Sequence, residues 1–440
     1  MGVRPDLHES SAEAGALESP GRVVVGATPE VRGDDQLAPL SQVYALIIHV
    51  PYYVDECGEV WMEPLWHRDV MEHLTYIKRL LLVAPRLPKG DRPGLIRLQP
   101  PPGAELEFEQ LPHYQSMAEA LLKIPRLLLV MWRATSKAQI VHSGIVGWPF
   151  PAGWIANPLA LVRGRKLVLV IESATWRLTG SRDDNWRRHV RAVAYERLGR
   201  WFVEHADLSF FTQPSYRDAL FVRGRGRAEI TPASWINHED IAPLATAVES
   251  WDRKLAWPRA RLLFAGRLTS DKGVEVLLDA VKRLDATRAS VEIDLIGEGP
   301  LAEAATQLAC TLQHTRLNVL QMVPYGAPFF DLLRDYEAVL IPSLSDEQPR
   351  IVFDAYSQGV PVIATSTAGL VPHVIEGKTG RLVAKGDADA FATAVRRAIE
   401  DRSQLRSMGL AALAEATEYT HRAMHRKRWR AILETFGSAP

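Results

Sequence analysis

The chain has 440 residues, too many for a single hydrophobic core, so two domains of about 200 residues each are expected. Apolar residues make up 47% and charged residues 24%, an ordinary globular composition that excludes a disordered or fibrous protein. Lys plus Arg and Asp plus Glu both number 52, so the bulk charge gives no reason to expect a nucleic acid partner.

The cysteines and the N-terminus indicate the compartment. Cys57 and Cys310 lie far apart and offer neither a disulfide framework nor a zinc-ligand spacing, which favours a reducing compartment. The N-terminus lacks the pattern of a signal peptide, and no apolar run reaches the roughly 18 residues that a membrane span needs. We therefore expect a cytoplasmic protein, with peripheral contact at the inner face of a membrane as a further option. Residues 1–40 are predicted to form a flexible leader.

Short apolar runs alternate with longer amphipathic segments through residues 41–250. This alternation is typical of an open parallel sheet with helices on both faces, and it defines a first Rossmann-like domain. The predicted strands are 43–50, 79–84, 140–142, 167–171, 208–211 and 229–230, and the predicted helices are 66–76, 116–131 and 185–205.

A second series of the same kind occupies residues 251–420. Residues 246–260 break the pattern and contain a proline, so the domain boundary is predicted there. The predicted strands are 261–265, 291–296, 317–321, 338–341, 361–364 and 380–383, and the predicted helices are 273–284, 300–313, 327–334, 350–358, 388–400 and 403–417. A last helix at 421–436, within a segment 421–440, is expected to cap the sheet or to cross back to the first domain.

The predicted fold class is therefore α/β, with two doubly wound domains that face a cleft. Ligands of such sheets lie at the carboxyl ends of the strands, so a site between the domains is expected.

The loop after strand 261–265 carries Gly266, Arg267 and Lys272 ahead of a helix. A planar guanidinium, a compact ammonium and a helix N-terminus together suit an anionic diphosphate. The alternative is a pair of ordinary surface cations beside a turn. The loop has neither the GK[ST] of a P-loop nor a GxGxxG pattern.

Two further loops follow at corresponding strand ends. Glu298 stands between two glycines in the run 296–300 (IGEGP), where close backbone approach to a ligand competes with a simple tight turn. Asp346 precedes the helix 350–358, and Asp354 lies eight positions later on its first turns. Both carboxylates suit the hydroxyl groups of ribose and of a sugar, and the amides of Arg350 and Ile351 suit phosphate oxygens. Alternatively, Asp346 is a helix-terminal charge and Asp354 is a surface residue.

At this point the sequence resembles a known family. The ordered motifs GRLxxxKG, GEGP, an acid pair at eight-residue spacing, GVPVIAT and VIEGKTGRLV are similar to those of family 4 glycosyltransferases (glycosyltransferase group 1) of the GT-B fold. The detailed resemblance covers residues 260–400, and the order of strands and helices extends it over most of the chain.

The resemblance implies a retaining transfer from a nucleotide sugar, without a metal at the site. By resemblance, Arg267 and Lys272 hold the diphosphate as it leaves, Asp354 binds the ribose, and Asp346 contacts the transferred sugar. Glu298 then lies near the base. The implied mechanism is front-face, in which the departing phosphate helps to take the proton of the acceptor, and the protein supplies position and electric field.

The chain departs from the family in three places. The acid pair is Asp and Asp where Glu and Glu are usual, and the usual small glycines after the first acid are replaced by 347–349 (EQP). The N-terminal glycine-rich loop is replaced by 51–59 (PYYVDECGE), with the single glycine Gly58. These departures leave open the hydroxyl contacts of the acids and the phosphate contacts of the first domain.

The first domain is expected to bind the acceptor. His142 ends a strand where the family often has a site histidine, and Glu172 ends the strand 167–171, although a strand-end residue of either kind is more often structural. Trp66 and His67 follow the first loop and offer stacking surfaces for a sugar, with core packing as the alternative for Trp66. The basic stretches 163–166 (RGRK) and 425–430 (HRKRWR) are either solvated faces or contacts with an anionic membrane or a lipid-linked acceptor.

The leading hypothesis is a glycosyltransferase that uses a UDP- or GDP-linked sugar and a saccharide or glycolipid acceptor in surface polysaccharide or cell-envelope glycan assembly, with no cofactor. A sugar-nucleotide epimerase or phosphorylase on the same fold, and a non-catalytic nucleotide-sugar binder, are the alternatives. A nicotinamide dehydrogenase is disfavoured because no GxGxxG follows the first strand.

Overall fold

The computed structural model describes residues 39–88, 90, 94–114, 116–147, 151–174, 176–177 and 185–437. Within these, contacts group the chain from Pro39 onward into one unit. The predicted leader lies outside the described residues except for its last two positions, and Leu40 already begins the first strand. Among the helices of the described residues, none is both long and apolar enough to cross a bilayer.

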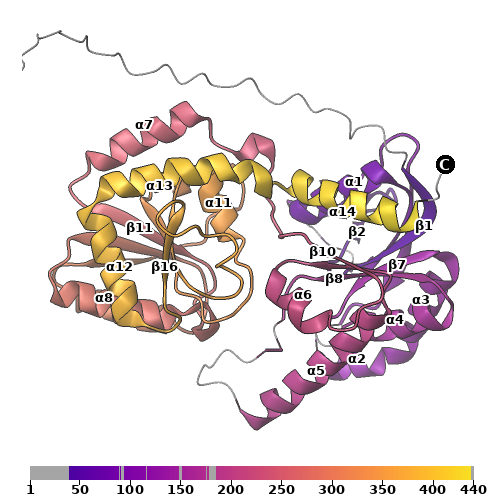
Figure 1. The fold of residues 1–440 in the computed structure, drawn as a ribbon. Coiled ribbons are helices and arrows are strands. Elements are labelled where there is room, and N and C mark those ends of the chain that lie inside the picture. The colour runs from indigo at the N-terminus through magenta and orange to yellow at the C-terminus, as the bar shows by residue number, and fades with distance from the viewer. Residues whose placement is uncertain are drawn as a thin grey trace, which may run out of the picture. The chain divides into compact units, whose positions relative to one another are not determined.

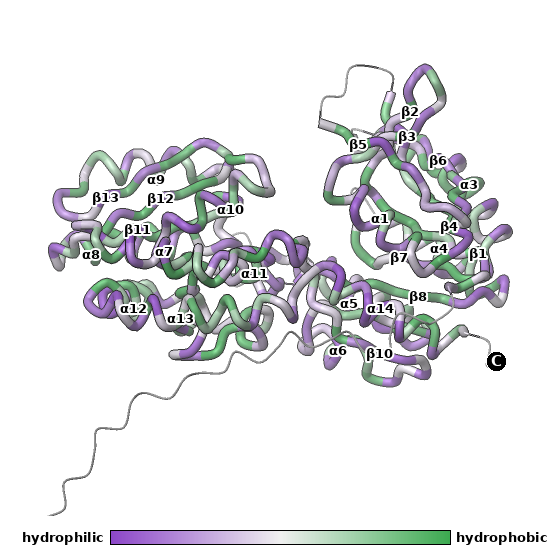
Figure 2. Tube along the Cα trace, turned by 90° about the horizontal axis from the view of Figure 1, so that it is seen from above, coloured by the Kyte–Doolittle hydropathy of each residue, from purple (hydrophilic) through white to green (hydrophobic). Residues whose placement is uncertain are grey.

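The first half of the chain forms a seven-stranded parallel sheet in the order β10-β9-β8-β7-β1-β4-β6. Its strands are mostly buried apolar runs, as parallel strands covered on both faces require, and the hydrophobic colouring of β8 in Figure 2 shows this. The strands are β1 (Leu40–Ile47), β4 (Ile77–Pro85), β6 (Glu105–Leu111), β7 (Ile140–Gly144), β8 (Lys166–Ile171), β9 (Leu208–Phe211) and β10 (Arg227–Ile230).

The helices of this half differ from the prediction in that α4 (Gly153–Val162) and α6 (Pro214–Leu220) were not predicted and one predicted helix is divided. The single helical stretch expected at 116–131 is split at Lys123, and Pro125 stands in the first turn of the second piece. Proline fits a first helical turn because the N–H that it lacks would have no intrahelical partner there. A second helix therefore begins at this point. The helices are α1 (Pro64–Tyr76), α2 (Met117–Leu122), α3 (Ile124–Lys137), α4 (Gly153–Val162), α5 (Trp186–His205) and α6 (Pro214–Leu220).

A small antiparallel sheet, absent from the prediction, follows β1. It consists of β2 (Tyr53–Val54), β3 (Val60–Met62) and β5 (Ile96–Arg97). Asp55 closes its first turn by accepting hydrogen bonds from the Glu59 amide and the Trp61 indole, both at 2.8 Å. The segment that replaces the family's glycine-rich loop is therefore a structured hairpin.

The second half forms a six-stranded parallel sheet in the order β13-β12-β11-β14-β15-β16. Strand order reverses between β11 and β14, and ligands of doubly wound sheets bind at the carboxyl side of such a switch point. The strands are β11 (Ala260–Ala265), β12 (Val291–Ile296), β13 (Arg316–Leu320), β14 (Ala338–Ile341), β15 (Val362–Thr365) and β16 (Gly380–Val383).

Helices cover both faces of this second sheet. Leu262 packs in one apolar cluster with residues of α8 and α12, which lie side by side in Figure 1, and Leu263 packs in another with residues of α10 and α11. The elements are α8 (Val274–Ala286), α9 (Ala302–Ala309), α10 (Ala327–Leu333), α11 (Ile351–Ser357), α12 (Ala388–Glu400) and α13 (Arg402–Glu415), with the 3-10 turns η2 (Ser270–Lys272) and η3 (Ala416–Tyr419).

The predicted break at 246–260 overlaps a helix, α7 (Leu244–Leu255), which follows the 3-10 turn η1 (His238–Asp240). Trp251 donates from its indole to the Gly359 carbonyl at 2.8 Å, and Lys254 donates to the Tyr336 carbonyl at 2.9 Å. The helix therefore packs on the second sheet's elements, and the division of the chain at 250/251 remains a prediction.

The last helix, α14 (His421–Phe436), contacts the first half of the chain. Its residues Ala431, Ile432 and Phe436 share an apolar cluster with Tyr44 of β1 and Phe210 of β9, and it runs beside α1 (Figure 1). In the basic stretch 425–430, His425 and Arg428 are buried. That stretch is therefore not one solvated face.

Candidate functional site

Three loops meet at the carboxyl ends of the second sheet, around its switch point. The Gly266 amide donates to the Ile296 carbonyl at 2.9 Å, and the Leu268 amide donates to the Glu298 carbonyl at 2.8 Å. The Leu344 amide donates to the Asp271 carbonyl at 3.0 Å. The loops that carry Arg267, Glu298 and Asp346 are thus joined through their backbones, although they are far apart in sequence.

Glycines permit this close approach of the loops. Gly273 has φ +72°, and a Cβ there would stand 1.8 Å from the Pro342 carbonyl oxygen. A Cβ on Gly297, at φ +154°, would stand 1.8 Å from the Gly266 carbonyl oxygen. Any side chain at either position would push the loops apart, so the glycines of GRLxxxKG and GEGP are fixed by loop packing.

The two predicted phosphate ligands differ in their surroundings. Arg267 is exposed (67% of its side chain), and its guanidinium lies 3.5 Å from the Asp271 carboxylate. Lys272 is only 22% exposed, and its Nζ lies 3.0 Å from Oε2 of Glu347. Arg267 is thus exposed to a diphosphate from solvent, whereas Lys272 is paired with a carboxylate of the chain.

Asp354 is buried on α11, with 5% of its surface exposed. The Tyr325 hydroxyl donates to its Oδ1 at 2.8 Å. Burial raises the pKa of Asp354 from 3.8 to about 7, against the opposing effects of the Tyr325 hydrogen bond and the Arg350 charge. This carboxyl ionises as the pH rises through neutrality, and one of its oxygens accepts a hydrogen bond from a tyrosine. Such a group suits recognition of hydroxyl groups.

Asp346 lies in the loop between β14 and α11 and is partly exposed. Its Oδ1 accepts a 3.4 Å bond from the Ala368 amide and lies 3.8 Å from Nζ of Lys385. Its backbone carbonyl accepts a 2.5 Å bond from the side-chain amide of Gln213, which follows β9 of the first sheet. A residue of the first half of the chain therefore helps to hold the Asp346 loop.

The remaining residues that are predicted to bind the nucleotide-sugar donor lie around the same loop. Helix α11 begins at Ile351, and the guanidinium of the preceding Arg350 lies 5.4 Å from the ring centroid of Trp235. The first amides of a helix lack intrahelical partners, which keeps those of Arg350 and Ile351 suited to phosphate. Pro349 just before them has no N–H to offer. Glu298 is exposed at the edge of its loop.

His142 occupies a different environment, in the buried core of the first half of the chain. Its Nδ1 lies 2.7 Å from the Tyr44 hydroxyl, and its ring packs against His73. Burial, together with the neighbouring His73 and Arg428 side chains, holds the pKa of His142 well below its ordinary value, so the imidazole is neutral. The structure thus places it in a polar cluster with other histidines, and its catalytic role remains a prediction.

The other acceptor-side residues are each held by a protein partner. Glu172 lies 3.6 Å from the buried Arg428, and Trp66 packs edge-on against Trp235 at 5.8 Å. His67 contacts the Arg97 carbonyl at 3.1 Å. Trp66 and Arg350 both meet Trp235, so this tryptophan links the predicted acceptor side to the Asp354 helix.

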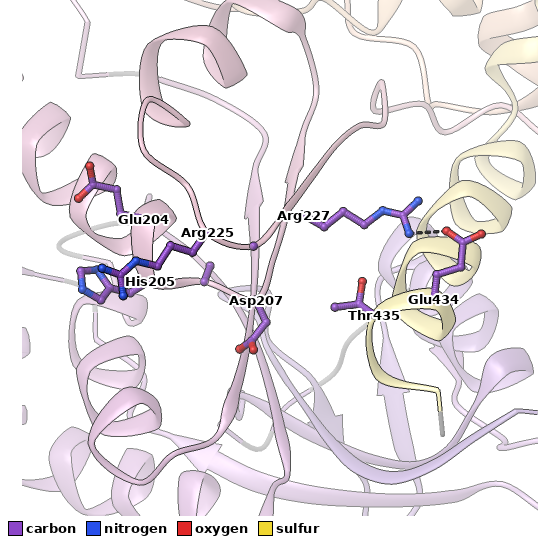
Figure 3. A pocket seen from close by; sticks show the side chains of 9 residues that line it. Glu204, His205, Asp207, Arg225, Arg227, Glu434 and Thr435 are labelled. Carbon is purple, nitrogen blue, oxygen red and sulfur yellow. Dashed lines mark hydrogen bonds and ion pairs between the residues drawn. The ribbon is translucent and has the colours of Figure 1, made fainter. Parts of the chain in front are cut away.

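A hollow of about 570 Å³ lies elsewhere, at the amino ends of β9 and β10 (Figure 3). Several of its polar residues are engaged with one another or with the backbone, as when Asp207 accepts from the Leu167 amide at 2.8 Å. Parallel sheets bind ligands at the opposite edge, so we do not assign the donor to this hollow. Its lining includes Glu204, Asp207, Arg225, Arg227 and Glu434, and Arg227 pairs with Glu434.

Sequence reasoning missed Tyr325, Gln213 and the contact of Glu347. Tyr325 stands in a loop with no periodic pattern, and its hydrogen bond spans 29 residues of sequence. Gln213 is 133 residues from its partner Asp346. Glu347 was singled out only as a departure from the family's glycines. No local pattern carries these pairings, since they depend on how the loops meet.

Comparison with known proteins bears on the family and on the fold. Residues 259–401 match the family described as glycosyl transferases group 1. The sulfoquinovosyl transferase SQD2 of Arabidopsis thaliana is 23% identical over 339 residues, covering 71% of this chain and 59% of that protein. The chain spans between 40% and 59% of the length of three curated relatives that it matches.

Solved structures share the fold over nearly the whole chain. The sucrose-phosphate synthase of Thermosynechococcus elongatus has a TM-score of 0.67 at 18% identity and covers 90% of this chain and 100% of that one. Anabaena Alr3699/HepE in complex with UDP-glucose has a TM-score of 0.59 at 16% identity, with the same coverage. Residues 259–401 are thus similar to the glycosyl transferases group 1, and the two Rossmann-like sheets form the GT-B fold that the motifs predict.

Proposed function

We propose that the chain is a retaining hexosyltransferase that uses a nucleotide sugar, with UDP as the favoured nucleotide and GDP as the alternative. The observation that carries the proposal is the backbone junction of the Arg267, Glu298 and Asp346 loops at the switch point of the second sheet. Relatives described as glycosyltransferases, and a fold neighbour solved with UDP-glucose, support the donor class.

Each residue has a proposed role that follows from its chemistry. Arg267 and Lys272 neutralise the diphosphate as negative charge develops on it, and fixed charges aimed at a leaving group are a large catalytic contribution. Asp354 accepts hydrogen bonds from ribose hydroxyls, and Asp346 accepts them from the sugar. Glu298 borders the space for the base. This assignment rests on the motif positions and on the loop geometry.

The proposed reaction takes place on one face of the sugar. The bond between the anomeric carbon and the diphosphate oxygen breaks, and the acceptor oxygen bonds to that carbon from the same side. The acceptor proton passes to the departing diphosphate, so no protein nucleophile is needed. Positioning of the acceptor then determines the rate.

The proposed acceptor is a saccharide or a lipid-linked saccharide, in surface polysaccharide or cell-envelope glycan assembly at the cytoplasmic side of a membrane. Exposed apolar residues of α2, α3 and α4, namely Leu122, Trp132 and Val162, support contact with lipid. The guanidinium of Arg163 lies 3.7 Å from the ring centroid of Trp132, which places a cation beside this apolar surface. Binding to vesicles with and without anionic lipid, compared for the protein and Arg163→Glu, tests this part.

The reaction is tested by donor consumption. The protein is incubated with UDP- and GDP-sugars, with and without a mixture of saccharide and lipid-linked acceptors, and free nucleotide and anomeric configuration are followed. Nucleotide release that requires acceptor and retains configuration supports the proposal. Epimerised donor without acceptor, or binding without turnover, would instead favour the epimerase or the non-catalytic binder.

A further inference from the structure

A buried cluster of imidazoles surrounds a carboxylate where α1 meets α14, away from the donor loops. Asp69 and His73 lie one helical turn apart on α1, and His421 and His425 lie one turn apart on α14. Residues four apart share a helix face, so each helix presents two ligand-type side chains to the other. All four residues are buried, with at most 6% of their surfaces exposed.

Three of the ligand atoms form a nearly equilateral triangle. Oδ1 of Asp69 lies 3.0 Å from Nε2 of His425 and 3.4 Å from Nε2 of His421, and the two Nε2 atoms are 3.2 Å apart. Bonds of about 2.0–2.1 Å around a tetrahedral zinc ion imply ligand atoms roughly 3.3 Å apart. The triangle therefore has the dimensions of one face of such a coordination shell.

His73 lies beside this triangle, with its Nδ1 3.3 Å from Oδ2 of Asp69. Its Nδ1 lies 2.8 Å from the Asp69 backbone carbonyl, which only accepts, so Nδ1 carries the proton and Nε2 carries a lone pair. That Nε2 is buried without a hydrogen-bond partner in the described part of the chain. One ligand atom each from Asp69, His73 and His425 lies within 4.8 Å of the others. A buried lone pair without a donor is costly unless a cation or a proton meets it.

The outer contacts of His73 and His425 are those of metal-bound histidines, whereas Nδ1 of His421 is buried without a hydrogen-bond partner in the described part of the chain. A metal-bound histidine commonly donates its other ring nitrogen to an oxygen that fixes the ring. Nδ1 of His425 meets the Tyr76 hydroxyl at 2.9 Å, as Nδ1 of His73 meets a carbonyl. Trp235 stacks on the His421 ring with 5.3 Å between centroids. The rings are thus held in place from outside, with their Nε2 faces turned inward in His421 and His425.

A buried cation lies one turn farther along α14. The guanidinium of Arg428 faces Glu172 at 3.6 Å.

We propose that Asp69, His73, His421 and His425 bind one structural zinc ion that joins α14 to α1. Three imidazoles and one carboxylate are a donor set that zinc favours, and a closed four-coordinate site is structural rather than catalytic. The ion would fix α1. Arg68 of this helix lies 3.6 Å from Asp240 and donates to the Trp235 carbonyl at 2.7 Å. It is separate from the metal-free donor chemistry proposed above.

The first test is the metal content of the full chain, purified without a metal-affinity tag. We expect close to one zinc per chain by elemental analysis. After replacement by Co²⁺, we expect the intense visible absorption of a tetrahedral nitrogen and oxygen site. Protein without zinc that neither takes up Zn²⁺ or Co²⁺ nor gains thermal stability from them would overturn the proposal. The cluster would then be a hydrogen-bonded network around Asp69.

Variants locate the ion. His425→Gln and His421→Gln are expected to lower the zinc content at least tenfold, whereas His373→Gln, which removes a buried histidine packed on Phe353 of the second half, leaves it unchanged. Zinc retained in both cluster variants would contradict the assignment. If a cluster variant does not fold, the Co²⁺ spectrum of the unsubstituted protein decides, because it reports ligand type and geometry without a substitution.

Discussion

Nζ of Lys272 lies 3.0 Å from Oε2 of Glu347, and both side chains are mostly buried. Lys272 ends the 3-10 turn η2, two residues before helix α8 begins, and Glu347 follows the first acid of the pair, where the family usually has a small glycine. Glu347 thus supplies an internal anion to the lysine that we propose binds the diphosphate. A diphosphate must displace this carboxylate or bind beside it.

Glu347→Gln should therefore tighten the binding of UDP. Removal of one negative charge beside the diphosphate is expected to raise the affinity by roughly threefold to tenfold, a modest electrostatic effect for a partly solvated pair. Calorimetric titration with UDP measures it. The control is Glu249→Gln, which makes the same change in net charge at an exposed position of α7 and is expected to leave the affinity unchanged. Weaker binding of UDP by Glu347→Gln would show instead that Glu347 supports the donor site.

Lys272→Met should weaken UDP binding by about tenfold to a hundredfold, since a charge-assisted hydrogen bond to phosphate is removed. Circular dichroism and the melting temperature should stay close to those of the parent protein because the lysine lies at a loop rather than in the core. Lys378→Met, which removes an exposed lysine paired with Glu415, is the matched control. Equal affinities in the parent protein and Lys272→Met would remove this residue from the site.

The affinity for UDP-glucose should depend on the ionisation of Asp354, whose pKa burial raises to about 7. The ionised form accepts hydroxyl hydrogen bonds best, so affinity should fall between pH 8 and pH 6, by up to about tenfold per pH unit below 7. The groups around this carboxyl that enter the shift are Tyr325, Arg350 and Asp240.

UDP-glucose is the appropriate ligand because its diphosphate does not titrate in this range. In Asp354→Asn the affinity should be low and flat with pH, since the amide keeps the Tyr325 contact and loses the charge. A pH slope that survives in this variant would assign the titration to another group.

Asp354→Asn should also stabilise the protein in alkaline solution. The folded state holds the Asp354 proton up to a pKa of about 7, whereas the unfolded chain releases it near 3.8. The carboxyl thus lowers stability progressively as pH rises from 3.8 to 7, with a loss of at most about 4 kcal/mol above that range. Urea unfolding at pH 8 and pH 4 measures it: the gain should be present at pH 8 and nearly absent at pH 4, and a variant less stable than the parent at pH 8 would contradict this.

Much of the second sheet could be predicted from sequence because its strands are uninterrupted apolar runs. The predicted strands at 291–296, 338–341 and 380–383 coincide with β12, β14 and β16. The helix α7 was read as a break because its buried face includes Ser250 and Lys254, which hydrogen-bond to carbonyls instead of forming an apolar stripe. The antiparallel strands β2, β3 and β5 are too short to show alternation.

The site was predictable only as a set of loops. Strand ends and helix starts placed Arg267, Lys272 and Asp346 at one sheet edge, which follows from the parallel order of strands. The pairing of Lys272 with Glu347 and of Asp354 with Tyr325 depends on loop paths that no periodicity records. The spacing His421-x-x-x-His425 was visible in sequence, but its partners on α1 lie more than 340 residues away.

Donor turnover should not require Mg²⁺ or Mn²⁺, because Arg267 and Lys272 supply the positive charge for the leaving diphosphate. Rates with either ion in excess and with neither present should agree within about twofold. The zinc-loaded protein is used throughout, so that the proposed structural ion stays constant. Activity that appears only on addition of Mg²⁺ or Mn²⁺ would contradict the metal-free account.

The central claim is that a nucleotide sugar binds at the switch point of the second sheet. A thermal-shift screen with UDP, GDP, ADP and dTDP and their common sugar forms tests it most directly, with Lys272→Met as control. A ligand at 100 times its dissociation constant stabilises a protein by about 2.7 kcal/mol, which is readily measured. We predict stabilisation by one nucleotide series, UDP first, that is strongly reduced in Lys272→Met. Absence of stabilisation by every nucleotide, or equal stabilisation of the variant, would contradict the proposed site.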